Sequence, residues 1–427
     1  MGESVLTTAF ARVDGALACE GVALATIANA VGTPTYVYSA NAVRDQYARL
    51  AAALDGVPYR IHYSLKANSN LALLRLLRSL GSAADVVSGG ELFRARRAGF
   101  SPRDIIFGGV GKTEREIADG IDAGVLLLNV ESEDELRVVD RLGRARGVEV
   151  PVALRVNPEI TVETPHSYIR TGEKGHKFGI PYDEVREVAR VAASLPNVVL
   201  HGLDMHVGSQ LSRLDVYQHG IDRVLELLAQ LRSDGARDLR YLDIGGGLAV
   251  TYEAEEPTDL TRFAEIVVPA VRVTGLQLIV EPGRFMVGNA GVLLSRVLYR
   301  KRSGGKELLV VDAGMTDLLR PSHYNAYHRI EAVEPIAGRS RVDVVGPVCE
   351  SGDFLALDRE LEDMHAGDLL AVQSAGAYGY VMASNYNTRG KPAEVLVDGD
   401  RFALVTQRES YQHLVMPELL EPEWRVD

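Results

Sequence analysis

The sequence predicts an α/β protein: a (β/α)8 TIM-type barrel with a C-terminal antiparallel β-sandwich or β-barrel domain. Three observations support this fold class. The chain has 427 residues, more than a single hydrophobic core usually serves. From residue 59, short apolar runs alternate with amphipathic stretches of helical period. After residue 283, strand-like runs follow one another with little helix between them, which is typical of a separate β domain.

The chain begins with short apolar pieces that show no sustained period. Residues 1–34 therefore read as an irregular segment, closed by a turn at Gly32, Thr33 and Pro34. Residues 35–38 are all β-branched or aromatic and predict a strand. Residues 40–54 carry apolar side chains at helical spacing, so a helix precedes the first strand of the repeat.

Eight strands and eight helices are predicted between residues 40 and 280. The strands are expected at 59–65, 84–87, 105–107, 125–130, 151–156, 200–206, 241–244 and 276–280. The helices are expected at 40–54, 70–80, 90–98, 113–123, 132–146, 182–195, 214–232 and 260–271. Equal numbers of alternating strands and helices are the pattern of a (β/α)8 barrel.

Several helix ends are marked by capping residues. Thr113 with Glu116, and Ser132 with Glu135, both fit a capping box, in which a hydroxyl and a carboxylate satisfy the first backbone amides. Glycines that suit a left-handed C-cap follow the helices at positions 81, 99, 124, 147 and 275. The helical periods are therefore bounded at both ends.

The C-terminal part predicts an antiparallel β domain. Its strands are expected at 292–301, 307–312, 341–345, 368–373, 393–397 and 402–406. Because the N-terminal segment precedes the barrel, we expect it to join this domain. The predicted division is a barrel at 35–284 and a β domain built from 1–34 and 285–427.

Composition and charge favour a small-molecule partner. The formal net charge of −12 gives no general attraction for nucleic acid or an acidic membrane surface. The two cysteines, Cys19 and Cys349, lie far apart in the sequence, so we expect no disulfide framework and a reducing, cytoplasmic setting. No secretory signal, membrane-spanning run or metal site is predicted.

In a (β/α)8 barrel, catalytic groups lie at the C-terminal ends of the strands. The first strand ends at Lys66, whose amine can form a Schiff base with a carbonyl group, although this stretch alone favours an ordinary surface lysine. The later strand ends carry Asp85, Arg155, His206 with Ser209, the glycines 245–247, and Glu281, Pro282, Gly283 and Arg284. Chemically useful residues thus gather where the fold places active sites.

The loops after strands seven and eight suit a phosphate group. Backbone amides of consecutive glycines such as Gly245 to Gly247 can cradle phosphate oxygens, and phosphate sites in this fold favour these two loops. The three glycines alone would indicate only a tight turn. Gly283 in the next loop makes the phosphate site the better interpretation.

Three further side chains suit a planar, charged cofactor. Glu281 could be a surface charge, but its carboxylate could also pair with a protonated ring nitrogen. Arg284 offers a planar fork for a carboxylate or phosphate. His206 could be a buried core histidine or lie flat against a ring. With Lys66 and the glycines, these side chains predict pyridoxal 5′-phosphate as the cofactor.

Six motifs extend this pattern over most of the chain. They are Tyr-Ser-Leu-Lys-Ala-Asn at 63–68, His-Val-Gly-Ser-Gln at 206–210, Asp-Ile-Gly-Gly-Gly at 243–247, Glu-Pro-Gly-Arg at 281–284, Cys-Glu-Ser-Gly-Asp at 349–353 and Gly-Ala-Tyr-Gly at 376–379. With these motifs the sequence resembles the fold-type III pyridoxal-phosphate decarboxylases, and among them the diaminopimelate decarboxylases. The segment 312–324 resembles the diaminopimelate-specific segment, but Ser322 and His323 are more polar than expected there, and Ser64 stands where Ala is common.

The resemblance implies a role for each site residue. The cofactor would be bound by Lys66, Asp85, His206, Ser209, Gly246, Gly247, Glu281, Pro282, Gly283, Arg284 and Tyr378. The substrate would be bound by Arg284, Arg320, Tyr324, Glu350 and Tyr378. The catalytic residues would be Lys66, which carries the Schiff base, His206, which stacks on the ring, and Cys349, which protonates the reacting carbon. Cys349 and Glu350 would reach the partner's site, so the resemblance also implies a homodimer with shared active sites.

The resemblance implies decarboxylation of meso-2,6-diaminopimelate to L-lysine and CO2, the last step of lysine biosynthesis. Arg320 would take a distal carboxylate and Glu350 a distal amine, as a substrate that is an amino acid at each end requires. One alternative is a related decarboxylase of ornithine, lysine, arginine or a carrier-bound amino acid. Another is a non-catalytic pyridoxal-phosphate-binding regulator, but such relatives usually lack the lysine, the cysteine or the second domain, and this chain keeps all three.

Overall fold

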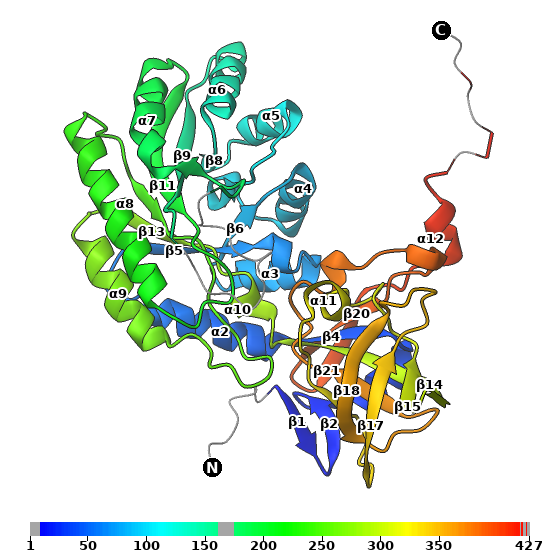
Figure 1. Ribbon diagram of the computed structural model, residues 1–427. Helices are drawn as coiled ribbons and strands as arrows, with labels where there is room; N and C mark the ends of the chain where they lie inside the picture. The colour runs from blue at the N-terminus through cyan, green and yellow to red at the C-terminus, as the bar shows by residue number, and fades with distance from the viewer. Residues whose placement is uncertain (1–8, 161–174, 419, 422–423, 425–427) are drawn as a thin grey trace. The chain divides into compact units, whose positions relative to one another are not determined.

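The structure is a computed structural model that describes residues 9–160, 175–418, 420, 421 and 424. Contacts divide the chain into two units, one within 40–289 and the other within 1–39 and 290–427. We describe each unit by itself and call them the barrel unit and the β unit (Figure 1). Among the described residues, no helix combines the length and the apolar character needed to cross a membrane.

The barrel unit contains a closed parallel barrel of eight strands, as predicted. The strands are β5 (Tyr59–Ser64), β6 (Ala83–Val86), β7 (Ile105–Phe107), β8 (Leu127–Val130), β9 (Val150–Asn157), β11 (Val198–Met205), β12 (Tyr241–Asp243) and β13 (Gln277–Val280). Pairing runs from β9 through β11, β12 and β13 to β5 and on to β8, which closes the ring on β9. A short strand, β10 (Ile180–Pro181), adds to the edge of β9.

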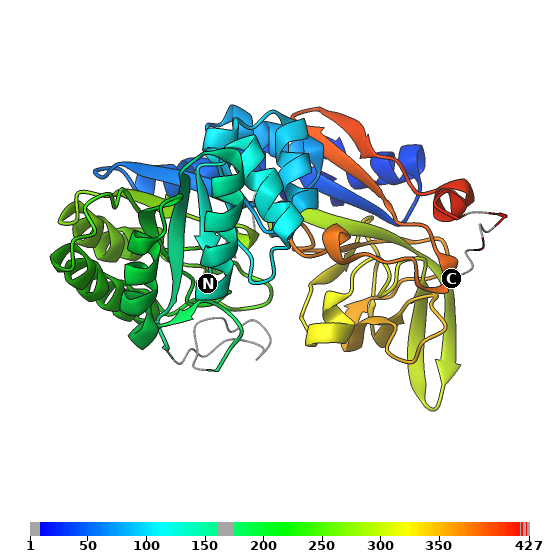
Figure 2. The same ribbon diagram turned by 90° about the horizontal axis from the view of Figure 1, so that it is seen from above.

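Among the described residues of the barrel unit, eight helices of at least nine residues accompany the barrel strands (Figures 1 and 2). They are α2 (Ala40–Ala53), α3 (Leu71–Ser79), α4 (Gly89–Ala98), α5 (Glu114–Ala123), α6 (Glu133–Arg146), α7 (Val185–Ser194), α8 (Asp215–Ser233) and α9 (Leu260–Arg272). Each buries one apolar face, as α3 does with Leu73, Leu74 and Leu77. The strands are buried on both sides, and Ile106, Ala153 and Ile279 form part of their core.

One of the two predicted capping boxes forms completely. Thr113 accepts the amide of Glu116, and the Glu116 carboxylate accepts the amide of Thr113, at the start of α5. At α6, Ser132 accepts the amide of Glu135, but the Glu135 carboxylate accepts the amide of Glu131 at 2.9 Å instead of the amide of Ser132. The second capping box therefore forms only one of its two hydrogen bonds, because the Glu135 carboxylate binds the amide of Glu131.

The β unit is built on a nine-stranded mixed sheet. Its strands are β4 (Thr35–Ser39), β14 (Gly291–Ser303), β15 (Lys306–Val311), β16 (Ile330–Ala332), β17 (Arg339–Val345), β18 (Phe354–Glu362), β19 (Leu369–Val372), β20 (Ala393–Asp398) and β21 (Arg401–Thr406). Most pairs are antiparallel, but β15 pairs with β17 and β4 with β20 in parallel. The prediction of a purely antiparallel domain is corrected to a mixed sheet.

The N-terminal segment is more regular than expected. It forms the three-stranded sheet β1 (Phe10–Val13), β2 (Ala16–Cys19) and β3 (Val22–Ala23), followed by α1 (Leu24–Val31). The amide of Leu17 donates to the carbonyl of Val333 at 2.8 Å, which joins this segment to the rest of the β unit. Since β4 pairs with β14 and β20, the contacts divide the chain after Ser39 and Asn289 rather than after 34 and 284.

Candidate active site

Each unit carries part of the predicted site. The barrel unit carries Lys66, Asp85, His206, Ser209, Gly246, Gly247, Glu281, Pro282, Gly283 and Arg284. The β unit carries Arg320, Tyr324, Cys349, Glu350 and Tyr378. We describe the geometry of each group within its own unit.

Lys66 follows β5 directly, in the single 3-10 turn Leu65–Ala67. Its Nζ lies 3.5 Å from Oδ2 of Asp85, a buried residue of the neighbouring strand β6 that pairs with Ser64. The hydroxyl of Ser64 donates to the same Asp85 oxygen at 2.6 Å. The lysine side chain keeps 40% of its surface exposed, so its amine is both accessible and held by a buried carboxylate.

The glycines after β12 are required by close backbone packing. A Cβ at Gly246 would collide with the carbonyl oxygen of Glu281, and one at Gly247 would lie 2.5 Å from the carbonyl oxygen of Gly208. Gly247 also has φ +100°, a conformation that side chains disfavour. The loops after β11, β12 and β13 thus meet at one end of the barrel, where only glycine fits.

Two side chains, Arg284 and Tyr217, donate hydrogen bonds beside these glycines. Arg284 begins the short helix α10 (Arg284–Val287), and its guanidinium donates to the Tyr252 hydroxyl at 2.7 Å and to the Ser209 hydroxyl at 3.2 Å. The Tyr217 hydroxyl donates to the carbonyl of Gly246 and supports the loop. A cation with hydroxyls around it suits an anion such as a phosphate.

Tyr217 and Tyr252 were not predicted from the sequence. A tyrosine on the buried face of an amphipathic helix needs a partner for its hydroxyl, so the sequence could have indicated that Tyr217 on α8 makes a buried hydrogen bond. Tyr252 lies in an irregular loop and belongs to no motif. Its place beside Arg284 depends on tertiary structure alone.

His206 is held as a neutral imidazole. Its Nδ1 accepts the amide of Gly246 at 3.3 Å, which requires a free lone pair on that nitrogen. Burial, together with the positive charge of Lys66, lowers the pKa of His206 well below its ordinary value. An uncharged ring in this position suits stacking on a planar cofactor.

Three carboxyl groups gather at the ends of β11, β12 and β13. Oxygen atoms of Asp204, Asp243 and Glu281 lie within 4.8 Å of one another, and all three side chains are buried. Asp204 Oδ1 and Asp243 Oδ2 have no hydrogen-bond partner among the described residues. A cationic group placed beside these carboxyl groups, such as a protonated ring nitrogen, would stabilise their ionised form.

Burial raises the pKa of each of these three carboxyl groups. Burial, and then the charge of Asp243, raise the pKa of Glu281 well above its ordinary value. Burial raises the pKa of Asp204 to about 6, although Arg155 lies 3.8 Å away and opposes the shift. Such a cluster could also coordinate a metal ion, but the neighbouring positive charges of Arg155 and Lys66 disfavour one.

In the β unit, Arg320 and Tyr324 lie on the short helix α11 (Arg320–Tyr324). Nη1 of Arg320 lies 3.0 Å from Nε2 of His328, and Nδ1 of His328 lies 2.9 Å from the carbonyl of Gln373. Since a carbonyl only accepts, Nδ1 carries the proton and Nε2 accepts from Arg320. His328, which no motif indicated, therefore orients the guanidinium.

Cys349 and Glu350 are both exposed on the β unit. The amide of Cys349 donates to Oδ1 of Asn387 at 2.6 Å, which fixes the backbone while the thiol stays accessible. Cys349 is therefore not a buried apolar side chain. Tyr378 has φ +55°, a left-handed conformation that non-glycine residues adopt more often at functional sites than elsewhere.

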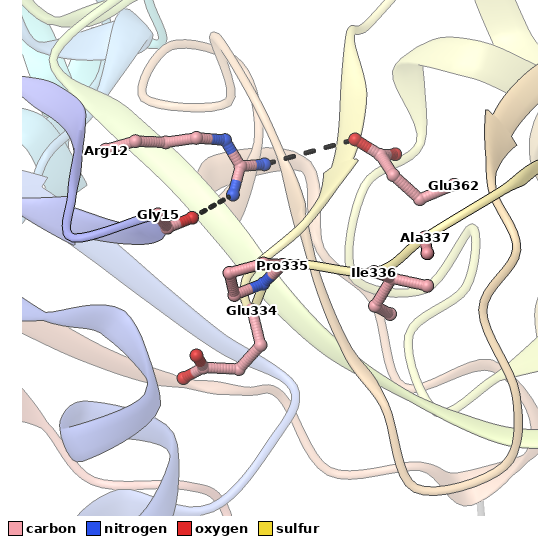
Figure 3. Close-up of a pocket in the computed structure, with 7 residues that line it drawn as sticks. All are labelled: Arg12, Gly15, Glu334, Pro335, Ile336, Ala337 and Glu362. Carbon is pink, nitrogen blue, oxygen red and sulfur yellow. Dashed lines mark hydrogen bonds and ion pairs between the residues drawn. The ribbon is translucent and has the colours of Figure 1, made fainter.

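A pocket of about 480 Å³ lies elsewhere in the β unit (Figure 3). It is lined by Arg12, Gly15, Glu334, Pro335, Ile336, Ala337 and Glu362. The guanidinium of Arg12 donates to the carbonyl of Gly15 at 2.8 Å and pairs with Glu331 and Glu362. Because its charge is matched within the protein and no predicted site residue lines the pocket, we assign it no function.

Comparisons with known proteins agree with this geometry. Residues 40–288 match the family model described as pyridoxal-dependent decarboxylase, pyridoxal binding domain. The chain is 46% identical over 415 residues to the diaminopimelate decarboxylase of Pseudomonas aeruginosa, covering 97% of this chain and 99% of that one. The chain belongs to the diaminopimelate decarboxylase family of pyridoxal-dependent decarboxylases.

Other relatives of this family are similar over their whole length. The diaminopimelate decarboxylase of Aquifex aeolicus is 43% identical, with 95% of this chain and 96% of that one covered. The crystal structure of the Helicobacter pylori diaminopimelate decarboxylase complexed with L-lysine matches with a TM-score of 0.89 and 38% identity, covering 92% of this chain and 99% of that one. The predicted family, fold class and pyridoxal-phosphate dependence are confirmed, while the individual residue roles stay predictions.

Proposed function

We propose that the chain decarboxylates meso-2,6-diaminopimelate to L-lysine and CO2, the last step of lysine biosynthesis, with pyridoxal phosphate as cofactor. The observation that carries the proposal is its 46% identity, over 97% of its length, to a diaminopimelate decarboxylase. The L-lysine in the Helicobacter pylori structure is the product that this reaction would release. The geometry of the two units is consistent with each part of this chemistry.

The residues of the barrel unit fit the cofactor. Arg284, Ser209 and Tyr252 would hold the phosphate beside the glycine loops. Asp204 and Asp243 each have a buried oxygen without a hydrogen-bond partner among the described residues, and a cationic group could bind there. In this place Glu281 would face the protonated ring nitrogen. Lys66 would hold the cofactor covalently through its amine. Pyridoxal phosphate, when bound, supplies a conjugated system that accepts the electron pair left by the departing CO2.

The carboxylate of Glu281, facing the ring nitrogen of the cofactor, would favour decarboxylation. The Glu281 carboxyl group, whose pKa is raised in the cofactor-free protein, would ionise beside a protonated ring nitrogen and would stabilise the positive charge there. His206, as a neutral imidazole, would stack on the ring without adding a competing charge. Asp85, beside Lys66, would retain the lysine near the reacting centre once it is released.

The residues of the β unit would recognise the substrate and complete the reaction. Arg320, oriented by His328, would bind the distal carboxylate, with Tyr324 on the same helix. Glu350 would bind the distal amine. The thiol of Cys349 would deliver a proton to the reacting carbon.

These roles imply an oligomeric state and a cellular compartment. We propose a homodimer in which Cys349 and Glu350 of one chain complete the site around Lys66 of the partner. A thiol that acts as an acid must stay reduced, and both cysteines of the described structure are free. We therefore propose a reducing compartment, the cytoplasm, as the place of action.

Release of CO2 from meso-diaminopimelate, L-lysine, L-ornithine and L-arginine tests the substrate. We expect meso-diaminopimelate to be preferred, because the others lack a distal carboxylate for Arg320. Equal or better turnover of ornithine would refute the substrate assignment and favour the related basic amino-acid decarboxylases. The lysine/ornithine decarboxylase of Vibrio vulnificus shares the fold, with a TM-score of 0.78 and 21% identity, and this likeness says nothing about substrate.

A further inference from the structure

Asp353 ends the Cys-Glu-Ser-Gly-Asp motif but has no part in the chemistry described above. Its side chain is buried, with 4% of its surface exposed. Its Oδ2 accepts the amide of Val348 at 2.6 Å, and its Oδ1 accepts the amide of Met315 at 2.6 Å. One carboxylate thus binds two segments: the cysteine loop (residues 346–353) and the arginine segment (residues 312–324).

Two glycines make room for this carboxylate. A Cβ at Gly314 would lie 2.6 Å from Oδ1 of Asp353, and a Cβ at Gly346 would also lie 2.6 Å from that atom. Neither glycine has a positive φ, so turn geometry does not require them. The Asp353 carboxylate packs directly against the backbone of both glycines, and at Gly346 the Cα of Gly314, 2.6 Å from the Cβ position, leaves no room either.

Further hydrogen bonds fix the same backbone. Gly346 donates to the carbonyl of Asp353 at 3.1 Å, and the amide of Asp353 donates to the carbonyl of Glu350 at 3.1 Å. The amide of Cys349 is bound by Asn387, as described above. The backbone around Cys349 is therefore held from two sides, while the Cys349 and Glu350 side chains remain exposed.

The arginine segment is fixed in a matching way. The amide of Gly314 donates to Oδ2 of the buried Asp317 at 2.9 Å, next to the amide of Met315 that Asp353 binds. Arg320 lies three residues after Asp317, at the start of α11. Asp353 consequently sets the spacing between the backbone that carries Arg320 and the backbone that carries Cys349 and Glu350.

We propose that Asp353 is a positioning residue, which holds the cysteine loop against the arginine segment so that Cys349, Glu350 and Arg320 keep the geometry needed for turnover. The catalytic consequence rests on the proposed function. The positioning itself concerns only the β unit and can be measured without substrate.

The test compares Asp353→Asn and Gly346→Ala with Asp343→Asn. The first variant presents an amide N–H to one of the two backbone donors, and the second places a methyl group against the intact Asp353 carboxylate. Asp343 is a matched control, because it is buried in the same unit and accepts the amide of Asp358 at 2.6 Å but does not bind the cysteine loop. Alkylation of Cys349 by iodoacetamide reports loop geometry, since Cys19 is fully buried.

We expect both test variants to keep the bound cofactor's visible absorbance, to lower kcat for meso-diaminopimelate by at least about tenfold, and to change the Cys349 alkylation rate by about threefold or more. Asp343→Asn should change neither rate beyond about twofold. The inference would be overturned if the test variants had the same alkylation rate and kcat as Asp343→Asn. It would also be overturned if kcat fell only in proportion to the amount of folded protein. Should Asp353→Asn fail to fold, Gly346→Ala decides alone. A wild-type enzyme inactive on meso-diaminopimelate would refute the proposed function, whereas the alkylation comparison would still stand.

Discussion

Lys66 illustrates how one side chain depends on its neighbours. The amine projects from a turn after β5, and the buried Asp85 carboxylate, 3.5 Å away, holds it at the end of the barrel. We predict that Lys66→Ala removes the visible absorbance band of the bound cofactor and lowers kcat by about 10³-fold or more, because no other group can take its covalent role. Lys306→Ala, at an exposed lysine of the β unit, should keep both. A band that survives Lys66→Ala would contradict the assignment.

Arg320 should decide between substrates. Its guanidinium is buried and oriented by His328, so a substrate carboxylate would meet a preorganised partner. We predict that Arg320→Gln lowers kcat/KM for meso-diaminopimelate by about 100-fold or more while changing kcat/KM for L-lysine much less. Arg339→Gln, at an exposed arginine paired with Glu360, serves as control. An unchanged preference for meso-diaminopimelate in Arg320→Gln would show that another group binds the distal carboxylate.

At this scale, the sequence indicated residues in motifs but not the residues that support them. Lys66 and Glu281 could be located because barrel strands place chemistry at their C-terminal ends. His328 and Tyr252 could not, since each meets its partner only through tertiary contacts between segments without a pattern. Asp204, which joins Asp243 and Glu281 in the carboxyl cluster, lies inside the mostly apolar strand β11. Its burial depends on closure of the barrel, which the strand's own sequence does not indicate.

The ends of β11, β12 and β13 make the stability of the cofactor-free protein pH-dependent. Burial raises the pKa of Asp204 from 3.8 to about 6. A carboxyl group with a higher pKa in the folded than in the unfolded chain stabilises the fold while it stays protonated. Its contribution is complete below the unfolded pKa and is lost as the pH rises through about 6.

We therefore predict that Asp204→Asn raises the free energy of unfolding of the cofactor-free protein more at pH 8 than at pH 5.5. The difference between the two pH values should be about 0.8 kcal/mol, measured by denaturant unfolding, because most of the loss between the unfolded and the folded pKa has already occurred at pH 5.5. Glu116→Gln is the control: the amides of Gly89 and Thr113 lower the pKa of Glu116, so its effect should be equal at both pH values. An Asp204→Asn effect that did not grow with pH would show that Asp204 is ionised at no cost.

The elements differed in how well the sequence revealed them. All eight barrel strands were predicted, because strands buried on both faces read as continuous apolar runs. Strand β18 was missed: it lies at the edge of its sheet and contains exposed charged residues such as Glu360, which break the strand pattern. Strands β1 to β3 were missed because they are only two to four residues long.

At the scale of the whole molecule, the site residues are split between two units of one chain. The barrel unit carries the groups that fit the cofactor, and the β unit carries Arg320, Cys349 and Glu350. The sequence indicated two domains from length and pattern, and the N-terminal segment was expected to join the second. Which chain's Cys349 completes a given site follows from assembly, and it is the central claim of the proposed mechanism.

Mixing two inactive variants tests that claim most directly. Lys66→Ala and Cys349→Ala chains are allowed to exchange subunits, with exchange verified by mass labels, and CO2 release from meso-diaminopimelate is measured. We predict that the mixture regains up to about a quarter of wild-type activity, because half of the dimers are mixed and each has one intact site. A mixture that stays inactive after verified exchange would contradict a site shared between Lys66 of one chain and Cys349 of its partner.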